Sequence, residues 1–172
     1  MLLKPSSEKG QKQAVQTAAF VDELLQQGLS VRIRVTGKSM KPFLRDKDMV
    51  TLEKTSSGQL RPGDMIFFRS DGDCPVLHRI VAKKQKKNRC FFYIMGDALT
   101  TLEGPVYEDQ IMGRVCYVER KGLKGIKYMN INRMSYRMKS VLTAFFILFR
   151  YRLIKSVSGL LQYLWQKPVT EE

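Results

Sequence analysis

Four side chains carry groups that could together break a peptide bond: Ser39, His78, Asp97 and Glu103. A serine hydroxyl is a poor nucleophile at neutral pH, so it needs a neighbouring base that removes its proton. His78 is the only histidine in the chain, and histidine is the side chain that most readily exchanges a proton near neutral pH. A carboxylate that accepts the other imidazole N–H holds the ring in one tautomer and stabilises the imidazolium. These residue types predict acyl transfer by a serine, if the fold brings them together.

Each of these residues also has an ordinary structural explanation. Ser39 lies between Gly37 and Pro42, and glycine, serine and proline are common in surface turns. His78 lies among apolar residues in VLHRIV, where a histidine is more often packed in a core than used as a base. Acids in loops, such as Asp97, usually cap turns or face solvent. Their spacing alone does not bring the four groups together.

The segments that must position these side chains are mostly of β type. Between residues 29 and 120 short apolar runs alternate with turn signals, a pattern typical of strands. The runs are SVRIRV, MVTLEK, DMIFFR, VLHRIVAKK, RCFFYIM and QIMGRVCYVER. Six strands without helices between them predict a compact, mainly β fold with mostly antiparallel pairing. Ser39 follows the first of these strands, where a rigid support can hold a reactive side chain.

Both ends of the chain are predicted to be helical. Residues 13–27 carry apolar side chains at helical spacing, and Gly28 follows as a stop signal. Residues 121–172 are first basic and then contain the most apolar run, VLTAFFILF. We therefore expect an N-terminal helical segment (1–28), a β domain (29–120) and a C-terminal appendage of basic amphipathic helices (121–172).

The apolar run of this appendage is short and is followed by charges. A membrane span needs ~20 apolar residues, but Arg150, Arg152 and Lys155 follow directly after residue 149. Each of these charges would cost roughly 2.5–3.5 kcal/mol at the centre of a bilayer. Two interpretations remain open. The segment forms helices that lie in the membrane interface, with Tyr163 and Trp165 near their end, or it forms a helix hairpin packed on the β domain.

The composition indicates an acidic partner. The chain has 30 Lys and Arg residues against 16 Asp and Glu, a formal net charge of +14, which suits nucleic acid or an anionic membrane. Three cysteines without metal-binding spacing and a single histidine argue against a disulfide framework and a zinc site. We expect no metal and no other cofactor. The first residues contain no secretory signal, so we expect a cytoplasmic protein, either free or peripheral on the inner face of the cell membrane.

Five motifs, in order, resemble those of the S24/S26 serine peptidase superfamily, which includes signal peptidase I and the LexA-type peptidases. GKSMKP at residues 37–42 resembles the box around the nucleophile. RPGDMIFF (61–68), LHRIV (77–81), GD (96–97) and IMGRV (111–115) resemble the boxes that follow it. The resemblance covers about residues 30–120 and implies the compact β fold of that superfamily.

The resemblance implies a role for each candidate residue. Ser39 is similar in position to the nucleophile. His78 is similar to the general base of the archaeal and endoplasmic-reticulum branch, where bacterial signal peptidases and LexA-type proteins have a lysine. Asp97 matches the first orienting acid, and Glu103 matches the second, which is usually an aspartate. The structural or substrate-binding positions of the boxes fall on Gly37, Met40, Pro42, Asp48 and Gly96.

The chain also departs from the pattern of the superfamily. Gly37 replaces the oxyanion serine of the bacterial enzymes, so backbone N–H groups around Ser39 would stabilise the oxyanion. Lys47 replaces the glycine that usually precedes the acid at Asp48, and residues 98–99 are Ala-Leu in place of Asn-Asn. A predicted helix stands where signal peptidases have their N-terminal membrane anchor.

The resemblance implies a serine endopeptidase of the signal peptidase-like type that cleaves a peptide or a leader-containing precursor. Two alternatives come from other classes. One is a catalytically inactive, peptidase-like binding module attached peripherally to an anionic membrane. The other is a nucleic-acid-binding protein, which the charge favours. The absence of a helix-turn-helix segment before the β domain speaks against nucleic acid as a partner.

Overall fold

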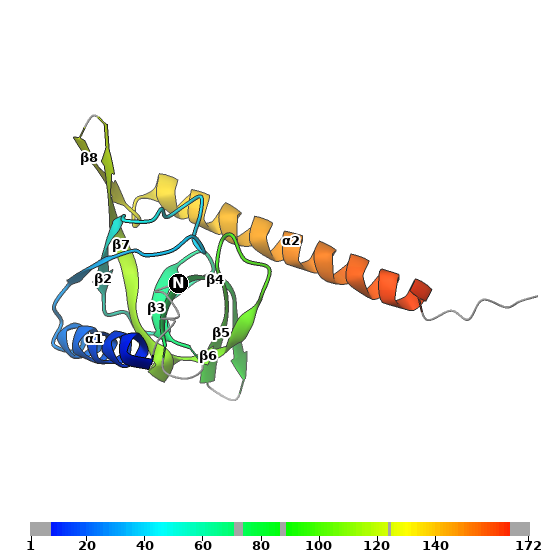
Figure 1. Ribbon diagram of the computed structural model, residues 1–172, viewed down its shortest axis with the longest axis horizontal. Helices are drawn as coiled ribbons and strands as arrows, with labels where there is room; N and C mark the ends of the chain where they lie inside the picture. Colours follow the sequence, from blue (N-terminus) through cyan, green and yellow to red (C-terminus); the bar gives the residue numbers. More distant parts are fainter. Residues whose placement is uncertain (1–7, 71–73, 87–88, 124, 166–172) are drawn as a thin grey trace, which may run out of the picture.

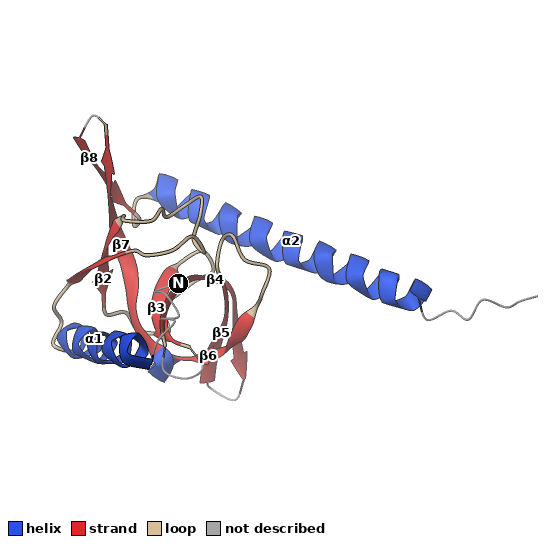
Figure 2. Cartoon of the chain, viewed as in Figure 1, coloured by secondary structure: helices blue, strands red, loops and turns tan. Residues whose placement is uncertain are grey.

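The computed structural model describes residues 8–70, 74–86, 89–123 and 125–165. Within them, eight antiparallel strands form one curled sheet, which lies between an N-terminal and a C-terminal helix in the sequence (Figures 1 and 2). The fold is therefore mainly β, as the sequence predicts. The helices are α1 (Glu8–Gln26), the short 3-10 helix η1 (Glu108–Gln110) and α2 (Met134–Trp165). The strands are β1 (Val31–Arg34), β2 (Met49–Glu53), β3 (Met65–Arg69), β4 (Pro75–Lys86), β5 (Arg89–Met95), β6 (Glu103–Tyr107), β7 (Ile111–Gly122) and β8 (Gly125–Asn130).

Strand β7 joins two parts of the sheet. The strand order is β1-β2-β7-β3-β4-β5-β6, and β8 pairs with β7 outside this path. Strands β2 and β3 are neighbours in the sequence, yet β7 lies between them. One part, β1 and β2, holds the loop with Ser39. The other part, β3 to β6, carries His78 and Glu103.

Two strands are additional to the six that the sequence predicts. Strand β6 contains Gly104 and Pro105, which are turn signals in the sequence but are tolerated here because β6 is an edge strand. Strand β8 lies in the segment expected to be helical. Residues 111–122 and 125–130 form the β7–β8 hairpin, with pairs from Tyr117↔Asn130 to Gly122↔Gly125. The sheet therefore continues to residue 130, ten residues beyond the end of the β-type pattern in the sequence.

Helix α1 packs on the sheet and is not a separate unit. Ala18, Val21 and Leu25 are buried in one apolar cluster with side chains of β2, β3 and β7. These three residues are spaced three and four apart, so they share one face of the helix. Gly28 follows with a φ of +80°, a backbone conformation that glycine adopts without steric cost and that commonly ends a helix.

A single continuous helix, α2, replaces the expected group of C-terminal helices. Ser140, Ala144 and Ile147 are buried on its packed side, and Ala144 and Ile147 form a cluster with Val81 and Met95. Residues 152–158 are exposed, and the second half of the helix extends away from the sheet (Figure 1). In the described part of the chain, no helix combines the length and the apolarity that crossing a membrane requires.

Gly63 lets α2 approach the backbone of the turn before β3. Its φ is +100°, and a Cβ atom at this position would lie 2.9 Å from the backbone nitrogen of Val141. Real Cβ atoms do not come that close to backbone, so a side chain at residue 63 would displace either the turn or the helix. The packing of α2 on the sheet therefore depends on this glycine.

Candidate active site

The imidazole of His78 lies against a carboxylate. His78 Nδ1 is 2.8 Å from Glu103 Oε1, and the His78 side chain is almost fully buried. Strand β5 separates the two residues in the sheet, because Ile94 pairs with Ile80 on one side and with Glu103 on the other. The curl of β4, β5 and β6 therefore lets Glu103 reach the ring across a strand.

The second nitrogen of the ring is buried without a hydrogen bond. Neither His78 Nδ1 nor Nε2 makes a hydrogen bond of acceptable geometry to a described residue. The Glu103 carboxylate is close to Nδ1 but lies off the direction of an N–H bond. Catalytic hydrogen bonds are often poorly aligned without substrate and tighten on binding. Nε2 is therefore the nitrogen with capacity to accept a proton.

Ser39 lies in the loop between β1 and β2 and is buried. Its carbonyl oxygen accepts a 2.8 Å hydrogen bond from the Ala98 N–H. A Cβ atom on Gly96 would lie 2.9 Å from the same carbonyl oxygen, so this glycine allows the two loops to touch. The loop of Gly96 and Ala98 directly follows β5, whose last residue, Met95, pairs with Arg79. The backbone of Ser39 is thus held at the end of β5 that lies opposite the residue after His78.

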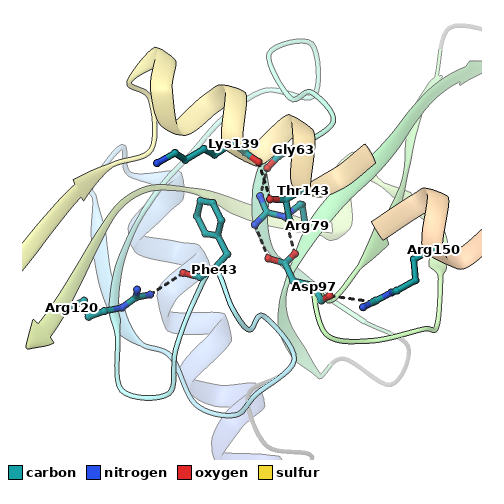
Figure 3. Close-up of polar contacts among 8 residues, drawn as sticks. All are labelled: Phe43, Gly63, Arg79, Asp97, Arg120, Lys139, Thr143 and Arg150. Carbon is teal, nitrogen blue, oxygen red and sulfur yellow. Dashed lines mark hydrogen bonds and ion pairs between the residues drawn. The ribbon is translucent and has the colours of Figure 1, made fainter. Parts of the chain in front are cut away.

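Asp97 makes a different contact from the one the sequence predicts. Both of its carboxylate oxygens accept hydrogen bonds from Arg79, at 2.8 Å from Nε and 2.7 Å from Nη2 (Figure 3). Both side chains are buried, with Arg79 0% exposed and Asp97 4% exposed. Among the described residues, the imidazole of His78 makes no hydrogen bond to Asp97. Among the predicted acids, Glu103 is the one that the structure brings to His78.

Arg79 connects the segments around the site, although the sequence motifs predict no role for it. Its Nη1 donates a 2.8 Å hydrogen bond to the carbonyl oxygen of Gly63, and its guanidinium lies 4.5 Å from the ring centre of Phe43. Arg150 of α2 donates a hydrogen bond to the carbonyl oxygen of Asp97 (Figure 3) and another to the carbonyl oxygen of Leu99. The available signal was an arginine inside an apolar strand, because arginine is almost never fully buried unless it is paired.

Asp48 closes the other end of the Ser39 loop. Its side chain is 2% exposed and accepts hydrogen bonds from the Arg45 N–H, at 2.8 Å, and from Arg120 Nη2, at 2.6 Å. The hydrogen bond to Asp48 raises the pKa of the Arg120 side chain. Arg120 also donates a 2.8 Å hydrogen bond to the carbonyl oxygen of Phe43 (Figure 3). Asp48 thus has a structural function in this loop.

The remaining residues of the nucleophile box shape the same loop. Gly37 has a φ of +98°, and its N–H donates a 3.0 Å hydrogen bond to Asp46 Oδ1. Lys47 has a φ of 70°, the conformation expected for the glycine that the superfamily usually has there. Met40 is buried in the apolar cluster that includes α1, whereas Pro42 is exposed and follows a cis peptide bond.

A cavity of about 660 Å³ opens beside the imidazole and its carboxylate. His78 and Glu103 form part of its wall, and Phe68 contributes a ring that is tilted against the imidazole at 6.4 Å. This volume is within the range of pockets that hold small ligands or side chains. The other lining residues come mainly from β6 and the segment before it, and they are Ser70, Cys74, Val76, Leu99, Thr101, Leu102, Gly104, Pro105, Val106 and Gln110.

Comparison with known proteins identifies the chain over most of its length. The family described as Peptidase S24-like matches residues 6–116. This range contains Ser39, His78, Asp97 and Glu103, together with the loop closed by Asp48. It does not contain β8 or α2. No curated protein matches the chain.

Proposed function

Because the chain belongs to the peptidase S24-like family, we propose that it is a serine endopeptidase with Ser39 as nucleophile and His78 as general base. The observation that carries the proposal is the environment of His78. One ring nitrogen lies 2.8 Å from a carboxylate, and the other is buried and makes no hydrogen bond to a described residue. This arrangement is what a base oriented by an acid requires.

In the proposed reaction, substrate binding brings the Ser39 hydroxyl to His78 Nε2, which takes its proton as the oxygen attacks the peptide carbonyl. Glu103 faces Nδ1 and stabilises the imidazolium that forms. The imidazolium then donates its proton to the leaving amine, and water hydrolyses the acyl-enzyme by the same steps. Backbone N–H groups of the loop around Ser39 are the proposed donors to the oxyanion, since Gly37 offers no side chain.

Two of the edge strands of the sheet, β1 and β6, indicate how a peptide would bind. Strand β1 leads into the Ser39 loop and β6 begins with Glu103, and the two stand at opposite ends of the strand order. Edge strands carry unpaired backbone groups that can bind an extended peptide. We propose that the substrate is an unfolded segment, such as the leader of a precursor, with one side chain in the cavity beside His78.

A peptide-library experiment tests this function. The full chain is incubated with a mixture of unstructured peptides, and new N-termini are identified by mass spectrometry. We expect cleavage by the wild type and a loss of at least about 10²-fold in Ser39→Ala and in His78→Ala. Ser57→Ala is the matched control, because the Ser57 hydroxyl contacts Glu108 at 2.7 Å and neither residue lines the cavity beside His78. Cleavage that persists undiminished in His78→Ala would mean that another group is the base.

A further inference from the structure

Helix α2 has an apolar side that the sheet does not cover. Its packed side contains Ser140, Ala144 and Ile147. On the opposite side, Phe145 is 70% exposed and Leu142 is 64% exposed, although apolar side chains of this size are usually buried. We call this surface the outer face of α2. Its exposed apolar residues are Met134, Met138, Val141, Leu142, Phe145, Phe146, Phe149 and Leu153.

The charges on α2 are all of one sign. The helix contains five basic residues and no acidic residue from Met134 to Trp165. At about 100° per residue, Lys139 lies just beyond one edge of the outer face, Lys155 lies beyond the other edge, and Arg152 lies near that second edge. Lys139, Arg152 and Lys155 are exposed. An apolar stripe bordered by basic side chains is the pattern of a helix that lies in a membrane interface.

The β7–β8 hairpin, next to the start of α2, also exposes apolar side chains beside basic ones. Leu123 is fully exposed at its tip and Ile126 is 55% exposed, while Lys121 and Lys127 are exposed beside them. The hairpin projects from the curled sheet close to where α2 begins (Figure 1). Two elements that are adjacent in the chain therefore expose apolar side chains among lysines.

We propose that the outer face of α2 binds the surface of an anionic lipid bilayer, with its apolar side chains among the acyl chains and its basic side chains at the headgroups. The positive charge of α2 distinguishes between the possible binding partners of the outer face. A second copy would bring together two basic faces without an acid between them, and like charges repel. Nucleic acid would neutralise the basic residues but would leave the apolar stripe exposed, whereas an anionic bilayer satisfies both. The proposal does not depend on the peptidase function, because α2 lies outside the matched region.

Vesicle binding by the full chain tests the proposal. The protein is sedimented with vesicles of phosphatidylcholine alone and with vesicles that also contain phosphatidylglycerol. We expect binding to the mixed vesicles and at least about tenfold weaker binding to phosphatidylcholine alone.

Variants separate the outer face from the rest of the molecule. Phe145→Glu should abolish vesicle binding, because a carboxylate in the apolar stripe opposes both insertion and the anionic surface. Phe20→Glu is the matched control, since Phe20 is 60% exposed on α1, and it should bind like the wild type. Replacing Arg152 and Lys155 with Gln should weaken binding about tenfold or more, because each basic residue near the surface contributes to attraction.

Other outcomes would overturn the proposal. A protein that ignores both vesicles and is dimeric in solution, with Phe145→Glu monomeric, would place a second copy on the outer face. Equal binding to both kinds of vesicle would remove the role of charge. Binding that Phe145→Glu leaves intact would assign the surface to another element. Ser39→Ala should bind vesicles as the wild type does. The vesicle result can therefore be interpreted even if the peptidase assay detects no cleavage.

Discussion

At the residue scale, the two acids predicted to orient His78 make different contacts. Glu103 lies 2.8 Å from the imidazole, whereas Asp97 is bound on both oxygens by Arg79. The order of the sequence motifs predicts that both acids orient the base. Nothing in the sequence reveals that the arginine directly after His78 engages one of them. The geometry therefore separates an acid that faces the proposed chemistry from an acid that holds the loops together.

The first prediction concerns Glu103→Gln. The amide keeps the size of the side chain but loses the charge that stabilises the imidazolium, so peptide cleavage should fall by roughly 10²-fold. The free energy of unfolding should change little, because the Glu103 side chain is partly exposed. Cleavage assays and urea denaturation measure the two effects. Glu23→Gln, on the exposed side of α1, is the control, and an unchanged cleavage rate in Glu103→Gln would remove Glu103 from the reaction.

At the element scale, the Arg79–Asp97 pair links four segments of the chain. Through its hydrogen bonds and its contact with Phe43, Arg79 joins β4 to the Gly63 turn, the Ser39 loop and the loop after β5. Arg150 then ties α2 to the loop after β5. This pair is therefore expected to be a determinant of stability and of loop position.

The second prediction is a double-mutant cycle on this pair. Arg79→Met should lower the free energy of unfolding by about 3–5 kcal/mol, because it leaves the Asp97 carboxylate buried without a partner. Arg79→Met combined with Asp97→Leu should recover much of that loss, since both buried charges are then removed. Urea denaturation of both variants and of Asp97→Leu gives the coupling free energy. Losses that simply add would show that the two side chains do not depend on each other.

Some elements of the fold could be predicted from the sequence pattern, and others could not. The six strands with apolar periodicity and the apolar face of α1 could be predicted, because burial on one side of a strand or helix leaves a regular pattern. Strand β6 could not, because Gly104 and Pro105 have the composition of a turn and only pairing with β5 makes the segment a strand. Strand β8 is likewise defined by its pairing with β7. Tertiary contacts outweighed local preference at both places.

At the scale of the whole molecule, the partly buried carboxyl of Asp64 makes stability depend on pH. Burial raises the pKa of the Asp64 carboxyl above its usual value of 3.8, although a backbone hydrogen bond from Arg61 and nearby arginines act in the opposite direction. The folded state therefore binds the Asp64 proton more tightly than the unfolded state does. This contribution to stability is complete below the usual aspartate pKa and is lost as the pH rises through the folded-state pKa.

The third prediction follows from the direction of this pH dependence. Asp64→Asn cannot lose this contribution, and its amide oxygen can still accept the hydrogen bond from the Arg61 N–H. Its free energy of unfolding, relative to that of the wild type, should therefore increase between pH 3.5 and pH 7, where the carboxyl ionises. Urea denaturation across this range measures the difference, with the exposed Asp109→Asn as control. A relative stability that decreases with pH would contradict the raised pKa.

The position of β7 between β2 and β3 has a consequence for folding kinetics. The Ser39 loop belongs to β1 and β2, while His78 and Glu103 belong to β3 through β6, and β7 pairs with both parts. Leu52, for example, pairs with Val115, across more than sixty residues of chain. Pairing between such distant segments is slow, because the entropy of closing a long loop is lost before the contacts form. We therefore expect the proposed catalytic residues to come together late in folding, once β7 has paired with both β2 and β3.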